Sequence, residues 1–236
     1  EGESLSALLR RERVLSPVTA VILTSQILAG LSAAHAKGVV HRDLKPGNIL
    51  LARLPDGGYV VKILDFGISK FFQDNVPQDV TAAGAVIGTP RFMAPEQAVG
   101  QPDLDARVDL YSVGVLLYRM VTGRLPFNAR TPEGIIQALL EGRSTPPREI
   151  QPDLLPALEA VVLKGMAANR ELRFQDARQF IQALQEAVPD ASGVPLQLNI
   201  HPGLPGDAGA LTPTASGTYN TGGLGMPTSS TMFPPP

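Results

Sequence analysis

Four polar side chains between positions 43 and 65 have the types that phosphate chemistry needs. Asp43, Lys45 and Asn48 lie close together along the chain, and Asp65 follows them after a short interval. A carboxylate can receive the proton of an attacking hydroxyl group, and cations neutralise the charge of phosphates. Asn and Asp side chains offer hard oxygen ligands to magnesium, an ion that binds through few protein groups. The set therefore suits phosphoryl transfer to a hydroxyl group, although a single aspartate is more often a helix cap or a turn residue.

A short hairpin is predicted between Asn48 and Asp65. The runs 49–53 and 59–64 are typical of strands, and the Pro-Asp-Gly-Gly sequence at 55–58 between them is typical of a tight turn. Such a hairpin folds residue 48 back beside residue 65. Both oxygen ligands can then converge on one site.

The remaining pattern is mostly helical. Ser4 and the leucines after it begin a short helix, and Ser16-Pro17 and Gly38 frame a long apolar one. Further helices are predicted over about 106–122, from 131–132 onward, and over about 154–168 and 176–187. Between the hairpin and these helices, residues 66–95 show no sustained period, and a loop of this length usually carries function or is mobile. We predict a mainly α domain with one small β-hairpin.

Composition excludes several classes of function. Twenty basic and twenty-two acidic residues give a net charge of −2, so no global field attracts nucleic acid or anionic lipid. Without cysteine, disulfides, thiolate nucleophiles and Cys-ligated zinc are excluded. The apolar stretches 18–36 and 108–121 are interrupted by polar residues and are predicted to be buried core helices, not membrane spans. From Pro189 onward Gly, Pro, Ser and Thr dominate, so residues 189–236 are predicted to form a disordered linker or tail.

Three motifs occur in a fixed order. Residues 41–48, HRDLKPGN, fit the pattern H-R-D-L-x-x-x-N, and Asp65-Phe66-Gly67 and Ala94-Pro95-Glu96 follow them. A three-letter match alone carries little weight, but this ordered set, with a hairpin between its first two members, is specific. Over residues 1–188 the chain resembles protein serine/threonine kinases of the bacterial, eukaryotic-like type. The resemblance implies the α+β C-terminal lobe of that fold, with ATP and magnesium, or manganese in its place, as cofactors.

The resemblance also implies roles for individual residues. Asp43 is then the catalytic base, and Lys45 reaches the transferring phosphate. Asn48 and Asp65 hold the metal and help to bind the nucleotide. Leu50 packs under the adenine ring, although simple core packing fits this residue equally well.

A second group of residues is implied to regulate the activity. Arg42 precedes the catalytic aspartate, and kinases with this arginine are commonly activated by phosphate in the loop that follows. Thr81 is the predicted phosphorylation site, with Ser69 as the alternative. Thr89 lies in the segment that resembles the substrate-docking segment of serine/threonine kinases and is expected to touch the catalytic Asp and Lys.

Further residues are implied to be structural. His41 and Phe66 are packing residues of their motifs. Asp109 is the buried helix aspartate that accepts hydrogen bonds from the catalytic-loop backbone, and Arg173 pairs with Glu96. Removing one member of such a buried pair costs about 3 to 5 kcal/mol.

The chain also departs from the kinase pattern. Neither a G-x-G-x-x-G loop nor the lysine of a V-A-I-K motif precedes residue 41. Residues 1–5 resemble the segment after the interlobe hinge, so the N-terminal lobe is expected to be absent and the isolated chain to bind nucleotide weakly and turn over slowly. Gly47 stands where many kinases that select basic peptides carry Glu, so arginine-directed recognition has no support.

Two other functions stay open at this point. A pseudokinase or signalling scaffold would bind partner proteins without transferring phosphate. A small-molecule phosphotransferase is disfavoured by the A-P-E motif and the long loop before it, which serve protein substrates. The kinase interpretation predicts protein substrates with Ser or Thr, ATP, no nucleic acid, no membrane span in this chain and a cytoplasmic location, with membrane anchoring of a longer parent and the oligomeric state left open.

Overall fold

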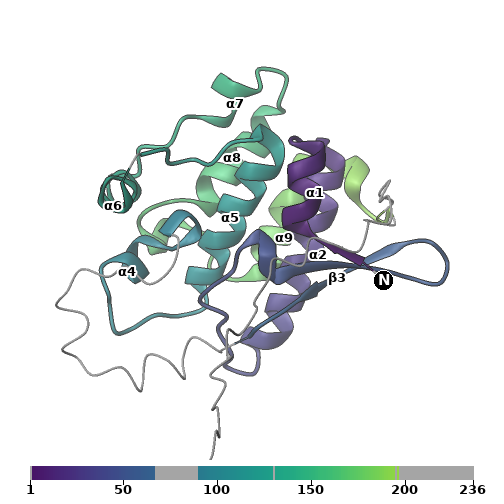
Figure 1. Ribbon diagram of the computed structural model, residues 1–236, viewed down its shortest axis with the longest axis horizontal. Helices are drawn as coiled ribbons and strands as arrows, with labels where there is room; N and C mark the ends of the chain where they lie inside the picture. Colours follow the sequence, from purple (N-terminus) through teal and green to yellow (C-terminus); the bar gives the residue numbers. More distant parts are fainter. Residues whose placement is uncertain (1, 67–89, 130, 195, 197–236) are drawn as a thin grey trace, which may run out of the picture. The chain divides into compact units, whose positions relative to one another are not determined.

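The computed structural model describes residues 2–66, 90–129, 131–194 and 196 (Figure 1). All of these belong to one unit, Glu1–Pro202. A second unit, Gly203–Pro236, lies outside the described residues, as do Thr81, Thr89 and the last glycine of the Asp65-Phe66-Gly67 motif.

An antiparallel sheet of three strands packs against the helices (Figure 1). Its strands are β1 (Gly2–Ser4), β2 (Ile49–Arg53) and β3 (Tyr59–Ile63), in that order across the sheet. The β2–β3 pair is the predicted hairpin, with Ile49 opposite Ile63. Strand β1 was not predicted, because three residues show no strand pattern. A Cβ at Gly2 would collide with the Leu51 carbonyl oxygen, so glycine permits this close pairing.

Eight α-helices lie in the described ranges. They are α1 (Leu5–Glu12), α2 (Pro17–His35), α4 (Pro95–Ala98), α5 (Arg107–Thr122), α6 (Pro132–Leu140), α7 (Pro147–Ile150), α8 (Pro156–Gly165) and α9 (Ala177–Ala187). Short 3-10 turns occur at Pro46–Asn48, Pro90–Phe92, Arg170–Leu172 and Pro189–Ala191. The end of the predicted long loop thus already forms a 3-10 turn and begins α4. Helix α7 was missed because a single turn shows no period.

The predicted caps occupy the helix starts. The Ser4 hydroxyl oxygen accepts from the Ala7 N–H at 3.2 Å, and that of Ser16 accepts from the Thr19 N–H at 3.1 Å. Gly123 ends α5 in the left-handed conformation, with a φ of 71°. Local capping chemistry therefore sets the ends of the helices that carry the site.

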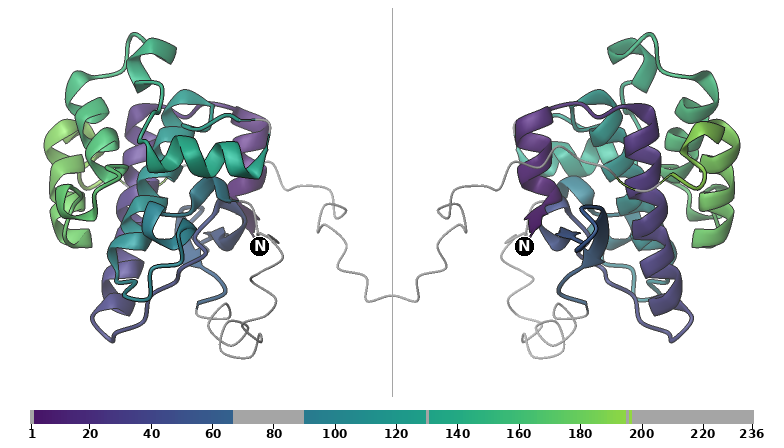
Figure 2. Two further views of the ribbon diagram at one scale, coloured as in Figure 1. Left: turned by 90° about the vertical axis from the view of Figure 1, so that its left-hand side faces the viewer. Right: turned by 90° about the vertical axis from the view of Figure 1, so that its right-hand side faces the viewer.

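The core forms around α2. This helix packs against α5, α9 and β3, and Figure 2 shows α8 and α9 on the opposite side of α2 from α1. Helix α2 is the one helix among the described residues with the length and apolar composition of a membrane span. Eight of its residues are buried inside this unit, which is the packing of a core helix.

Two glycines let α5 and α8 approach closely. A Cβ on Gly114 would lie 2.8 Å from the Gly165 carbonyl carbon, and a Cβ on Gly165 would lie 2.8 Å from Phe180 Cζ. The ring of Phe180 stacks on Phe174, with the centroids 4.3 Å apart. The backbones of α5 and α8 therefore come so close at Gly114 and Gly165 that a methyl group would not fit at either position.

The packed region extends past Val188, where the domain was predicted to end. Residues 189–191 form a 3-10 turn, Ala191 is buried, and Leu196 is 2% exposed. The Leu196 carbonyl oxygen accepts from the Tyr59 N–H at 3.2 Å. The Gly- and Pro-rich composition from Pro189 onward gives no sequence signal for these few anchoring contacts.

We expect Gly114→Ala to destabilise the fold by about 1 to 3 kcal/mol, because overpacking forces the backbones of α5 and α8 apart. Gly30→Ala in α2 is the matched control, since its Cβ would meet only the Ile63 side chain. Alanine is more stable than glycine inside a helix by about 0.5 to 1 kcal/mol, and this gain should offset any shift of the Ile63 side chain. Urea denaturation of both variants measures the difference; equal stabilities would contradict the close α5–α8 contact.

Candidate active site

The backbone before Asp43 is held in an unusual conformation by a buried carboxylate. Arg42 has a φ of 67°, a region that residues other than glycine rarely adopt. The Arg42 N–H donates to Asp109 Oδ1 at 2.8 Å, and the His41 N–H donates to Asp109 Oδ2 at 2.9 Å. Asp109 lies in the first turn of α5 and is fully buried. Its two oxygens fix two successive peptide groups and so direct the side chain of Asp43.

A third donor to Asp109 was missed in the sequence. His35, the last residue of α2, lies with Nε2 at 2.8 Å from Asp109 Oδ2. Because a carboxylate only accepts, Nε2 carries the hydrogen. A buried carboxylate needs several donors, and the backbone N–H groups alone leave capacity on Oδ2. The signal available beforehand was a lone histidine ending the helix that leads into the catalytic loop.

Gln97 was also missed. Its Nε2 donates to the Arg42 carbonyl oxygen at 2.8 Å, while its Oε1 accepts from the Ala94 N–H at 3.2 Å. Gln97 lies on α4, directly after Glu96. The strained residue 42 is thus held at its N–H by α5 and at its carbonyl by α4.

Asp43 and Lys45 form a solvent-accessible pair. Lys45 Nζ lies 2.6 Å from Asp43 Oδ2, and the two side chains are 47% and 56% exposed respectively. Asn48 is buried, and its Nδ2 donates to the Asp43 carbonyl oxygen at 2.9 Å. The amide donor of Asn48 therefore fixes the loop, which leaves its oxygen to face another ligand.

The hairpin brings Asn48 and Asp65 together. The Leu64 N–H donates to the Asn48 carbonyl oxygen at 2.8 Å, so the residue after Leu64 is close to Asn48. Asp65 has a φ of 60°, the second non-glycine residue of this site in the left-handed region. No group of three or more His, Cys, Asp or Glu that could hold a metal occurs in the described ranges. Asn48 and Asp65 would instead share an ion with waters and phosphates, as magnesium prefers.

His41 is buried and connects the two motifs. Its Nε2 donates to the Leu64 carbonyl oxygen at 2.8 Å, and its Nδ1 accepts from the Asp43 N–H at 3.2 Å. These partners suit the tautomer with hydrogen on Nε2. The ring meets Phe66 edge to face, with centroids 5.0 Å apart. His41 and Phe66 thus pack the catalytic loop against the end of the hairpin.

Leu50 lies on the outer face of the sheet. Its neighbours Ile49 and Leu51 are fully buried, and Leu50 between them is half-buried, as the alternation of a strand requires. Across the sheet it is opposite Lys62, which is exposed. An apolar side chain on this face is free to contact a ligand.

A pocket of about 290 Å³ opens beside Asp43. Residues 42–47 form one wall, and Ser6 of α1, Phe92, Met93 and Ser112 of α5 complete it. The Ser112 hydroxyl donates to the Phe92 carbonyl oxygen at 2.7 Å, which fastens the segment before α4 to α5. The pocket therefore has a rigid floor next to the candidate base.

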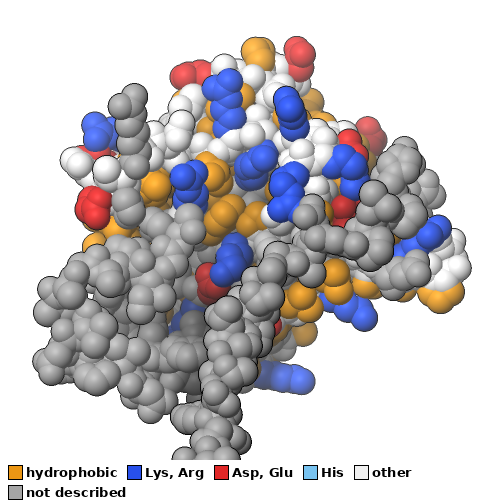
Figure 3. All heavy atoms as spheres, in the orientation of Figure 1, with side chains coloured by type: hydrophobic (Ala, Val, Ile, Leu, Met, Phe, Trp, Pro, Cys, Tyr) orange, Lys and Arg blue, Asp and Glu red, His pale blue; other side chains and the backbone are white. Residues whose placement is uncertain are grey.

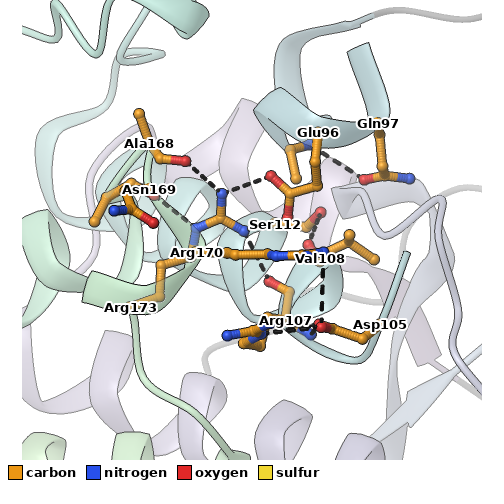
Figure 4. Close-up of polar contacts among 12 residues, drawn as sticks. Glu96, Gln97, Asp105, Arg107, Val108, Ser112, Ala168, Asn169, Arg170 and Arg173 are labelled. Atoms are coloured by element: carbon orange, nitrogen blue, oxygen red, sulfur yellow. Dashed lines mark hydrogen bonds and ion pairs between the residues drawn. The ribbon is translucent and has the colours of Figure 1, made fainter. Parts of the chain in front are cut away.

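A buried ion pair anchors α4. Arg173 Nη1 and Nη2 lie 2.6 and 2.7 Å from the two carboxylate oxygens of Glu96 (Figure 4). The guanidinium group also donates to the carbonyl oxygens of Ala167, Ala168 and Arg107, so its donors are fully used. Arg173 and Glu96 are 2% and 5% exposed. This is the pairing expected from the sequence, and it fixes the helix that presents Gln97.

The ring of Tyr111 packs against the same guanidinium group, 4.8 Å from its carbon. Burial raises the pKa of Tyr111, and its hydroxyl group has no hydrogen-bond partner within the described ranges. Tyr111 therefore contributes packing against Arg173.

A second layer of charges surrounds this pair. Arg107 Nη2 lies 2.7 Å from Asp105 Oδ2, and Arg170 Nη2 lies 2.6 Å from Asp103 Oδ2 (Figure 4 draws the first pair). Burial opposes ionisation of Asp105, but hydrogen bonds from Arg107 outweigh it and lower the pKa of Asp105. The Arg170–Asp103 pair ties the segment before α5 to the segment that carries Arg173.

Comparisons with known proteins agree with this geometry. The family described as the protein kinase domain matches residues 1–190. Serine/threonine-protein kinases Pkn1 and pkn3 of Myxococcus xanthus are each 42% identical to the chain, over 80% and 78% of its length. Serine/threonine-protein kinase PknB of Mycolicibacterium smegmatis is 34% identical over 82%. The matched regions cover 27%, 34% and 31% of these relatives, so the chain spans about a third of their length or less.

Glu96→Gln should lower the free energy of unfolding by about 3 to 5 kcal/mol, because it leaves the Arg173 charge buried without its partner. Glu186→Gln on the exposed face of α9 makes the same chemical change where it should cost less than about 0.5 kcal/mol. Urea denaturation followed by circular dichroism measures both. A small loss for Glu96→Gln would show that the pair is not needed for the fold.

Gln97→Glu should loosen the backbone around residue 42 without unfolding the domain. The substitution keeps an oxygen for the Ala94 N–H but replaces the donor to the Arg42 carbonyl with an acceptor. Loss of one such hydrogen bond, about 1 kcal/mol, corresponds to roughly fivefold faster amide exchange. Hydrogen exchange of residues 41–43 measures it, with Gln101→Glu beyond α4 as the control; unchanged exchange in Gln97→Glu would contradict the proposed hold.

Proposed function

The chain belongs to the protein kinase family, and on that premise we propose that it carries the catalytic half of an enzyme that phosphorylates Ser and Thr of proteins. The observation that carries this proposal is the Asp43–Lys45 pair, 2.6 Å apart, on a loop whose backbone is fixed by Asp109. A rigid, accessible carboxylate beside an ammonium group and a pocket is what this transfer requires.

In the proposed reaction Asp43 orients the substrate hydroxyl and receives its proton. The hydroxyl oxygen forms a bond to the γ-phosphorus of ATP, and the bond from that phosphorus to the bridging β,γ-oxygen breaks. ADP leaves with the electron pair of that bond. Lys45 stabilises the charge on the transferring group through its ammonium, which already lies within contact of Asp43.

The nucleotide and its metal ion would meet the chain at the hairpin. Asn48 has its amide nitrogen engaged with the Asp43 carbonyl oxygen, so its oxygen suits a hard cation, and Asp65 lies close by. Magnesium, or manganese in its place, would neutralise phosphate charge there. Leu50 offers an apolar contact to the adenine ring from the outer face of the sheet. The donor set therefore fits magnesium and ATP.

The acceptor is proposed to be a protein Ser or Thr. Lys45 two positions after Asp43 is typical of serine/threonine kinases, and the named relatives are serine/threonine-protein kinases. The pocket beside Asp43 can receive the residues next to the acceptor. Thr89, which we propose to touch Asp43 and Lys45, lies outside the described residues.

The remaining ATP-binding parts are proposed to lie outside these 236 residues. The sequence holds neither the glycine-rich loop nor the strand lysine of the family. We therefore propose low turnover for the chain alone and full activity for a protein that joins it to an N-terminal lobe. Such an enzyme would act in the cytoplasm, and the predicted linker or tail would begin only after Leu196, not at Pro189.

Regulation is proposed to act through Arg42. Arg42 lines the pocket beside Asp43, where a phosphate on the loop that follows the hairpin can pair with its guanidinium group. Thr81 is the proposed phosphorylation site and lies outside the described residues.

Asp43→Asn should abolish phosphate transfer in the protein that joins this chain to an N-terminal lobe. Loss of the proton acceptor should lower kcat by at least about 100-fold, while the fold stays intact because Asp43 is exposed. Magnesium-dependent transfer from radiolabelled ATP to a generic protein substrate measures it.

Asp56→Asn in the exposed β2–β3 turn is the matched control and should keep full activity. Transfer to Ser or Thr that vanishes only in Asp43→Asn supports the proposal. A folded protein with the N-terminal lobe that transfers no phosphate would instead be a pseudokinase or scaffold.

A further inference from the structure

Basic side chains follow the pocket residue Ser6 along helix α1. Ser6 lines the pocket together with Asp43. Arg10 lies four residues after Ser6 and hence on the same side of the helix, and Arg13 follows directly after the last turn. The leucines of α1 are buried on another side, while Arg10 and Arg13 are exposed.

The end of α5 adds two more arginines at the same place. Arg119 Nη1 donates to the Arg13 carbonyl oxygen at 2.9 Å. A Cβ on Gly123 would lie 2.8 Å from the Val14 side chain, so the two helix ends touch, and Arg124 follows with an exposed side chain. We call Arg10, Arg13, Arg119 and Arg124 the basic surface. Figure 3 shows Lys and Arg side chains spread over this face of α1 and α5.

The acidic side chains of α1, β1 and α5 do not pair with the basic surface. On α1 and β1, Glu12 and Glu3 both pair with Arg11, at 3.0 and 2.8 Å. On α5 the acidic side chain is Asp109, buried at the other end of the helix. Throughout the described ranges, none of the four arginines has a carboxylate partner within ion-pair distance.

Arg119 is partly buried in the basic surface. Desolvation lowers the pKa of Arg119, because the cation is partly removed from water without a carboxylate beside it. The chain as a whole has a charge of −2, so four such arginines in one place are a local concentration. A surface of this kind is complementary to anionic side chains.

We propose that the basic surface selects protein substrates that carry acidic or phosphorylated residues on one side of the acceptor hydroxyl. Arg10 lies about 6 Å beyond Ser6 along the helix axis, and an extended peptide advances about 3.3 Å per residue. The anionic side chains would then lie roughly two to five positions from the acceptor. The proposal names the substrate class of the proposed kinase and rests on that function for the identity of the acceptor.

Peptide binding tests the proposal without phosphate transfer. Labelled peptides would share one central Ser and carry Glu, Gln or Lys at positions two to five on either side. Fluorescence polarisation with the 236-residue chain should show the Glu peptide binding about tenfold more tightly than its Gln counterpart, because several exposed ion pairs add. The ratio should fall as salt is raised from 50 to 500 mM. Equal affinities for the Glu and Gln peptides would overturn the proposal.

Matched variants assign the effect to this surface. The double variant Arg10→Gln/Arg124→Gln should reduce the tenfold preference to less than about threefold. Arg53→Gln/Arg178→Gln changes two exposed arginines at the end of β2 and on α9 and should leave the preference unchanged. A preference that survives the first double variant, or that falls equally in the second, contradicts the assignment.

Two further readouts distinguish peptide selection from phosphate transfer and from membrane binding. Asp43→Asn should retain the peptide preference, because Asp43 lies outside the basic surface. If the unmutated protein with an N-terminal lobe discriminates between the peptides but transfers no phosphate, the proposed function alone is contradicted. Vesicles with 30% phosphatidylserine test the membrane alternative. Vesicle binding that requires Arg10 and Arg124, without discrimination between peptides, would assign the surface to lipid and overturn the proposal.

Discussion

The arrangement of the site depends on one buried carboxylate. Asp109 accepts from the backbone of His41 and Arg42 and from the ring of His35, and it is fully buried. Placing a charge in the core is unfavourable unless every lone pair finds a donor. Here the donors are the backbone groups that precede Asp43. The need to satisfy the carboxylate therefore holds the catalytic loop, and the left-handed Arg42 persists because its surroundings determine it.

Helix α5 extends this control to the substrate side. Its first turn holds the catalytic loop through Asp109, and Ser112, one turn later, holds the Phe92 carbonyl oxygen. The Arg107 carbonyl oxygen at the start of the same helix accepts from Arg173, which binds Glu96. Helix α5 therefore positions the candidate base Asp43, the pocket wall and α4. Close contact at Gly114 and Gly165 seats that element against α8.

The features that could be predicted from the sequence are those that depend on neighbouring residues or on a recognised motif. Capping residues, the β2–β3 hairpin and the Glu96–Arg173 pairing all follow from such signals. His35 and Gln97 could not be assigned in this way, because each acts through a partner far along the chain, Asp109 and Arg42 respectively. Strand β1, helix α7 and the anchoring of Leu196 are too short to show a period; they form because neighbouring elements supply hydrogen bonds and burial.

The most direct test of this account is the kcat of Asp109→Asn in the protein that includes an N-terminal lobe. The amide keeps the volume of Asp109 but presents one donor where a backbone N–H requires an acceptor. We predict a kcat at least about tenfold lower with little change in the KM for ATP, because misplacement of Asp43 affects the transfer step. A folded Asp109→Asn enzyme with normal kcat would contradict the claim that this carboxylate positions the catalytic base.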